Sequence, residues 1–153
     1  MTGQAKQNQK RHGLEISRVV DAPRDVAFRI WTTPAHLVRW WGPKDFTATI
    51  ERLEFREGGA YRHVIHKDDN HLGMSGVYRE IVAPERIVFT FAWDDEHGRP
   101  GDETLITVTF EEVGNKTRLT FSQEPFASVE SRDSHAAGWA ECLDRMHAYL
   151  AVI

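Results

Sequence analysis

The amino-acid sequence predicts an α+β fold in which a curved antiparallel sheet of about seven strands wraps around one long C-terminal helix. Apolar and polar residues alternate with a period of two in a series of short segments between residues 14 and 126. After residue 126 the period becomes that of an amphipathic helix. Two segments with helix-start signals lie between the first strand and the others. These three observations define the predicted order of elements.

The first strand is predicted over residues 14–20, and two short helices follow it. Pro23 is suited to the first turn of a helix that continues over residues 26–31. A second helix is predicted to start after Thr33, which can cap it, with Pro34 in its first position. Its apolar side extends to Trp41, and the Gly-Pro pair at residues 42–43 ends it.

Strands separated by turn signals make up the middle of the chain. Turn signals occur at three places: Gly58-Gly59, the polar run at residues 67–70 and the segment at residues 83–85. Residues 94–102 are expected to form a loop, and residues 113–115 to close a hairpin. The predicted strands cover residues 46–55, 61–65, 74–82, 87–93, 106–110 and the segment around 119–121.

The C-terminal segment, residues 127–153, is predicted to form an amphipathic helix of more than twenty residues. Its apolar stripe comprises His135, Trp139, Cys142, Leu143, Met146 and Leu150. A sheet with one apolar face and a helix with one apolar stripe bury these surfaces against each other. A space left between them is where a ligand would bind.

Length and composition limit the class of protein. A chain of 153 residues with 41% hydrophobic residues fits one domain, predicted over residues 14–153, after a polar, disordered tail at residues 1–13. The net charge of −4 argues against nucleic acid as a partner. No apolar run is long enough to span a membrane. A single cysteine cannot form an internal disulfide, and we expect a cytoplasmic location.

Four segments of the sequence are similar to a known family. They are residues 33–43 (TPAHLVRWWGP), 58–61 (GGAY), 76–90 (GVYREIVAPERIVFT) and the Gly-Trp, Leu-Asp-Arg and Tyr-Leu motifs within residues 138–150. In this order they resemble bacterial AHSA-type homologues of the activator of the heat-shock-protein ATPase. That family belongs to the START and birch-pollen-allergen-like (SRPBCC) superfamily, so the resemblance implies a helix-grip fold. The chain departs from the pattern at Ala83, where proline is common, and at His63, where an apolar residue is common.

The resemblance does not imply one reaction. Stand-alone bacterial members are mostly of unassigned function, and the eukaryotic activators bind a chaperone. Relatives in the wider superfamily bind lipids, polyketides, hormones or flavonoids, and a few catalyse cyclisation or dehydration. The fold alone therefore does not decide what this chain does.

The candidate ligand-binding residues are those predicted to face the space between the sheet and the long helix. They are Trp41, Phe46, Tyr61, His63, Tyr78, Phe89, Phe91, Trp93, His135, Trp139 and Met146. Each also has a purely structural interpretation, because aromatic stripes are usually packed cores. The tryptophan pair at 40–41 would anchor a helix, His63 would be a bonded core histidine, and His135 would pack the start of the last helix.

No metal, cofactor or catalytic residue is predicted. His63 and His66 lie three apart on one strand and face opposite sides of the sheet. His66 and His71 could meet across a hairpin, but two ligands hold zinc weakly. Cys142 falls on the apolar stripe and is expected to be a buried small hydrophobe.

The preferred hypothesis is that the chain binds a small hydrophobic molecule without catalysing a reaction. One alternative is a cyclase- or hydrolase-like enzyme for an aromatic or polyketide-like substrate, using His63 or His135 with a tyrosine or glutamate. The other is a module that binds a chaperone or another protein, and a homodimer contact stays open. A cavity smaller than about 100 Å³ would contradict both the binding and the enzyme hypotheses.

Overall fold

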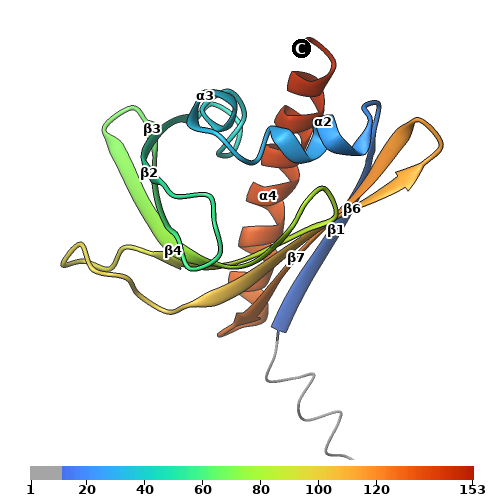
Figure 1. The fold of residues 1–153 in the computed structure, drawn as a ribbon. Helices are drawn as coiled ribbons and strands as arrows, with labels where there is room; N and C mark the ends of the chain where they lie inside the picture. The colour runs from blue at the N-terminus through green and yellow to red at the C-terminus, as the bar shows by residue number, and fades with distance from the viewer. Residues whose placement is uncertain (1–11) are drawn as a thin grey trace, which may run out of the picture.

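A computed structural model describes residues 12–153, and its architecture confirms the predicted fold class. Seven antiparallel strands form one curved sheet, and a long helix lies in the concave face of that sheet (Figure 1). Two short helices cross one end of the sheet (Figure 1). Most of the predicted tail, residues 1–11, lies outside the described residues.

The observed elements follow the predicted order. Most strands are longer than the alternation alone indicated, whereas the strand predicted over residues 46–55 covers only Thr47–Leu53. They are β1 (His12–Val20), α2 (Arg24–Arg29), α3 (Pro34–Leu37), β2 (Thr47–Leu53), β3 (Ala60–Lys67), β4 (Asn70–Val82), β5 (Arg86–Trp93), β6 (Thr104–Val113), β7 (Lys116–Phe126) and α4 (Val129–Leu150). The strand order in space is β1-β7-β6-β5-β4-β3-β2. Consecutive strands from β2 to β7 are neighbours, whereas α2 and α3 carry the chain from one edge of the sheet to the other.

The long helix α4 is closer to one half of the sheet than to the other. Its backbone comes nearest to β1, and Arg18 on β1 contacts Asp144 on α4 at 3.3 Å. Ser128 caps the first turn, since its side chain accepts a hydrogen bond from the backbone N–H of Ser131. The opposite side of α4 faces β3, β4 and β5, and side chains of all four elements line the space between them.

The second short helix is shorter than predicted. α3 ends at Leu37, and separate turns continue the chain to Trp41. Thr33 occupies the N-cap position, but its side chain makes no capping hydrogen bond. The prediction that Gly42 and Pro43 end this helix is therefore wrong, although Gly42 is a special backbone position: its φ is +107°, and a Cβ there would lie 3.2 Å from the Ile65 side chain.

The core joins the two short helices to the centre of the sheet. Trp31 packs edge-on against Trp40, Trp41 and Phe110, with ring centroids 4.7–6.3 Å apart. Both tryptophans of the 40–41 pair are buried, although only Trp41 reaches the space beneath α4.

No helix within residues 12–153 is long and apolar enough to cross a membrane.

Candidate ligand-binding site

An open pocket of about 340 Å³ lies between α4 and strands β3, β4 and β5. We call it the aromatic pocket, because five large aromatic side chains line it. Its lining comprises Trp41, Gly42, Pro43, Phe46, Ile65, Leu72, Met74, Phe91, Trp93, Ser134, His135, Gly138, Trp139 and Cys142. It lies on the side of α4 that faces away from β1.

The turn after α3 forms one wall of the aromatic pocket and is held by α4. The Nη1 atom of Arg145 donates hydrogen bonds to the carbonyl oxygens of Gly42 and Pro43, at 2.9 and 3.1 Å. Gly138 brings the helix backbone to the lining, and a Cβ there would meet only Pro43, at 3.7 Å. The width of the pocket therefore depends on a small residue on α4 and on a turn fixed by one arginine.

The tryptophans of the pocket expose ring carbon atoms to it, because their N–H groups are hydrogen-bonded within the protein. Trp41 donates to the sulfur of Met74 at 3.3 Å, and Trp139 donates to Oε1 of Gln123 at 2.8 Å. The rings of Trp41 and Trp139 pack edge-to-face with centroids 5.3 Å apart. Phe91 contacts Trp139 in the same manner. The wall thus consists mainly of ring faces and edges, which suit another aromatic ring.

His135 uses both ring nitrogens within the protein. Its Nδ1 lies 2.7 Å from the carbonyl oxygen of Ser131, which can only accept, so Nδ1 carries the proton. Its Nε2 accepts the indole N–H of Trp93 at 2.9 Å. Both ring nitrogens are therefore engaged within the protein.

Cys142 lines the pocket as a buried thiol and not as a nucleophile. Its Sγ contacts the carbonyl oxygen of Trp40 at 3.7 Å, and burial raises the pKa of the thiol to about 12. The thiolate, which is the reactive form, is therefore scarce at neutral pH. This agrees with the expectation that Cys142 is a buried small hydrophobe.

The histidine and tyrosines proposed as an acid–base pair lie outside the aromatic pocket. Tyr61, His63, Tyr78 and Phe89 surround a space of about 10 Å³ on the far side of Trp41, no larger than one water molecule. Burial raises the pKa of both tyrosines and lowers the pKa of His63 to about 4. The hydroxyl of Tyr61 donates to the carbonyl oxygen of Thr90 at 2.6 Å.

The expectation that His63 would be a bonded core histidine is only half right. Its side chain is buried, with 2% of its surface exposed, and its ring packs 4.8 Å from those of Trp41 and Tyr61. However, its Nδ1 has no hydrogen-bond partner among the described residues. The surroundings are aromatic rings, which offer close packing but few acceptors or donors.

The structure places the candidate residues in three groups. The aromatic pocket is lined by six of them: Trp41, Phe46, Phe91, Trp93, His135 and Trp139. Four surround the small space beyond Trp41: Tyr61, His63, Tyr78 and Phe89. Met146 is fully buried in the core and lines neither space.

Sequence reasoning missed several lining residues. Ile65 and Met74 carried a usable signal, because Ile65 alternates with His63 on β3, and Met74 is the cross-strand partner of Trp93. Cys142 also carried one, because it lies on the apolar stripe of the last helix. The others carried none, since residues such as Gly42, Pro43, Leu72, Ser134 and Gly138 are common in turns, on surfaces and in packed helices.

The histidines of the β3–β4 hairpin form a pair. His66 and His71 are cross-strand partners, their Nδ1 atoms lie 2.7 Å apart, and Nε2 of His66 contacts the hydroxyl of Thr49. Within residues 12–153, no group of three or more His, Cys, Asp or Glu side chains is arranged to hold a metal ion.

Comparisons with known proteins agree on one family. The model of the family described as Activator of Hsp90 ATPase homolog 1-like protein matches residues 21–151. A solved protein of Arthrobacter aurescens is 31% identical, with a TM-score of 0.81 over 91% of this chain and 86% of that one. A Chromobacterium violaceum protein is 26% identical, with a TM-score of 0.83 over 91% of this chain and 96% of its own.

A third structure supports the fold alone. The AHSA1 protein of Silicibacter pomeroyi is 24% identical and superposes with a TM-score of 0.84, over 92% of this chain and 98% of that one. The comparison with curated proteins gave no match.

Proposed function

Since this chain belongs to the Activator of Hsp90 ATPase homolog 1-like family and has an open pocket between its sheet and its long helix, we propose that it binds a small hydrophobic molecule there. The observation that carries the proposal is the aromatic pocket itself. Its volume of about 340 Å³ lies within the range of small-molecule sites, and its lining is mostly apolar. A space of this size is well above the limit at which the binding hypothesis would fail.

The lining favours a molecule with a flat ring system. Trp41, Phe91 and Trp139 present ring edges and faces at mutual distances typical of aromatic packing. The indole N–H groups and the ring nitrogens of His135 are already bonded within the protein. A polar ligand would lose hydration in this pocket and gain few partners, and this favours apolar molecules.

Binding without catalysis is favoured over the enzyme alternative. The titratable groups in the aromatic pocket are His135, with both nitrogens engaged, and Cys142, with a pKa raised to about 12. An acid–base pair needs two groups within reach of a substrate. His63 and the two tyrosines lie beyond Trp41, around a space too small for one. A cytoplasmic location, a chaperone contact and a homodimer stay predictions of the sequence.

The test uses N-phenyl-1-naphthylamine, a neutral fluorescent molecule of two linked ring systems. We expect its emission to rise and saturate on titration with the wild-type protein. Gly138→Leu is the blocking variant, because its side chain would extend into the pocket while the backbone has room for a Cβ. Replacing a glycine inside a helix also favours the helix, so this substitution should not destabilise α4.

Ala137→Leu is the matched control. It adds the same side chain to the exposed side of α4, one residue away from the lining. We expect Gly138→Leu to lose the fluorescence increase and Ala137→Leu to keep it. The proposal would be overturned if the wild type gave no saturable signal, or if both variants bound the probe equally well.

A further inference from the structure

A second pocket adjoins the first and differs from it in chemistry. It has a volume of about 260 Å³ and is formed by the end of β5, the loop after it, β6, β7 and the start of α4. Phe91, Trp93 and His135 line both pockets. We call the second one the polar pocket, because Asp94, Asp102, Thr104 and Gln123 contribute to its wall.

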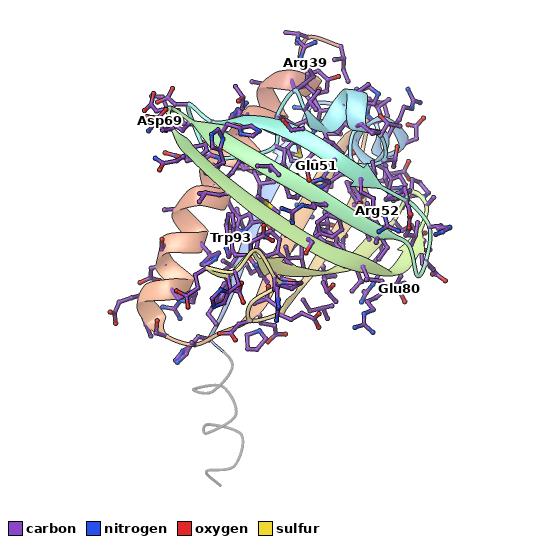
Figure 2. The ribbon with its side chains drawn as sticks, turned by 90° about the vertical axis from the view of Figure 1, so that its left-hand side faces the viewer. Arg39, Glu51, Arg52, Asp69, Glu80 and Trp93 are labelled. Atoms are coloured by element: carbon purple, nitrogen blue, oxygen red, sulfur yellow. The ribbon has the colours of Figure 1, made fainter. Side chains whose placement is uncertain are left out.

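The partition between the two pockets is one hydrogen-bonded pair of side chains. Trp93 stands beside α4 at the end of β5 (Figure 2), and its N–H donates to His135 at 2.9 Å. Both side chains are partly exposed. One neutral hydrogen bond between partly solvated groups contributes little net stability. A molecule that fills both pockets could therefore displace it by rotation of the Trp93 side chain.

The polar pocket favours a positively charged group over a negative one. Among its described lining residues, Asp94 and Asp102 carry charge, and none is lysine or arginine. Arg62 donates to both carboxylate oxygens of Asp94, at 2.9 and 2.8 Å, and holds the pKa of that carboxyl below its usual value. Asp102 is exposed and has no ion-pair partner within residues 12–153.

Buried polar groups connect the two pockets behind the partition. Gln123 accepts the N–H of Trp139 from the aromatic side and donates to the hydroxyl of Thr104 on the polar side, at 2.8 and 2.9 Å. Only 1% of the surface of Gln123 is exposed. This chain of hydrogen bonds fixes the rear wall, so the side that can move is the one formed by Trp93 and His135.

We propose that the two pockets are one elongated site, closed in the free protein by the Trp93–His135 hydrogen bond, and that its occupant is a molecule with an apolar ring system and an amine-bearing tail. The rings occupy the aromatic pocket, and the ammonium group faces Asp102 in the polar pocket. The placement of the rings rests on the proposed function. The inference adds that the ligand has a tail and that this tail is positively charged.

Three probes that share the dansyl ring system separate the two claims. Dansylamide has no tail, dansylcadaverine has a five-carbon tail ending in an amine, and dansyl-6-aminohexanoic acid has a similar tail ending in a carboxylate. We expect dansylcadaverine to bind about tenfold more tightly than dansylamide, because the tail buries further methylene groups. The carboxylate probe should bind more weakly than the amine probe, since its negative charge would face the unpaired Asp102.

Variants test whether the contribution of the tail to affinity arises in the polar pocket. Asp102→Asn should reduce the preference for the amine over the carboxylate tail by about threefold, in line with an exposed charge pair. Glu96→Gln is the matched control, because it removes the same charge from the same loop outside the lining. Ala127→Phe, which projects from the rim of the polar pocket, should bring the dansylcadaverine affinity close to that of dansylamide.

The outcomes distinguish the two proposals. If dansylamide does not bind the wild type, the proposed function fails. If dansylamide binds but the amine tail adds no affinity, or if Asp102→Asn and Glu96→Gln behave alike, the two-pocket inference is wrong while the function stands. A tail effect that Asp102→Asn and Ala127→Phe both diminish supports the elongated site.

Discussion

His63 shows how burial alone sets the chemistry of a residue in this fold. The ring lies among Trp41, Tyr61 and the residues around them, where a charged imidazolium would have neither water nor a carboxylate. Desolvation lowers its pKa to about 4, whereas an unfolded histidine titrates near 6.5. His63 is therefore neutral in the folded protein over the physiological range and is unsuited to act as a base.

The first prediction concerns acid stability. Because the folded pKa of His63 is depressed, the unfolded state gains a proton as the pH falls below about 6.5, while the folded state does not until about pH 4. Between pH 7 and pH 4.5 the free energy of unfolding should therefore fall, by roughly 2–3 kcal/mol from this residue. Urea unfolding at pH 7 and pH 4.5 measures the loss in the wild type.

His63→Phe provides the comparison, since it keeps an aromatic ring and removes the titrating group. We expect its free energy of unfolding to decline less between the two pH values than that of the wild type. His97→Phe serves as the control, because that histidine is exposed and should leave the decline unchanged. An identical pH dependence in His63→Phe and the wild type would contradict the prediction.

The second prediction concerns the thiol of Cys142. Its pKa is raised to about 12 by burial, so the folded protein should react slowly with Ellman's reagent at pH 8. The chain should release one equivalent of thionitrobenzoate in denaturant, because it holds one cysteine. A rapid full reaction of the native protein would show that the aromatic pocket admits the reagent to a reactive thiolate.

At the scale of elements, the sheet was more predictable than the short helices. A half-buried strand exposes every second residue, so apolar and polar residues alternate in its sequence. Residues 46–50, which begin one residue before β2, show this alternation. The helix predicted to extend from Pro34 to Trp41 stops at Leu37 instead. Trp40 and Trp41 must both be buried, in different surroundings, and separate turns achieve this where a continuous helix would point one of them elsewhere.

The third prediction tests the contact between α4 and the turn at residues 41–43. Arg145→Met removes the hydrogen bonds to Gly42 and Pro43 while keeping a long apolar side chain. We expect a loss of about 1–2 kcal/mol in the free energy of unfolding, since these bonds have a charged donor in a partly buried place. N-phenyl-1-naphthylamine should also bind more weakly, because this turn is a wall of the aromatic pocket.

Arg132→Met is the control on the same helix. Arg132 pairs with the adjacent, exposed Asp133, so its replacement should change stability by no more than about 0.5 kcal/mol. Chemical denaturation and probe titration on both variants give the two readouts. If Arg145→Met were as stable as Arg132→Met and bound the probe as tightly, the turn would not depend on Arg145.

At the scale of the whole molecule, the two halves of the sheet are covered unequally. α4 lies against β1, and fully buried residues such as Leu119, Phe121 and Leu143 fill that half. The other half holds the aromatic pocket. The sequence could not reveal this difference, because the apolar pattern of β5 and α4 is the same whether their side chains fill the space between them or leave a pocket. Phe91 and Trp139, for example, contact each other and also line the pocket. The outcome depends on the distance between α4 and β5, which all the intervening side chains set together.

The last prediction follows from this unequal covering. When N-phenyl-1-naphthylamine saturates the protein, hydrogen exchange should slow in the segments that line the aromatic pocket, namely residues 41–46, 72–74, 91–93 and 134–142. The β6–β7 hairpin around residues 111–118 does not line that pocket and should exchange at an unchanged rate. Mass spectrometry of peptides from the free and saturated protein measures both. Protection confined to the hairpin, or absent from residues 134–142, would place the probe elsewhere. Gly138→Leu, exposed to the same probe concentration, should show no added protection, which separates occupation of the pocket from a general effect of the probe.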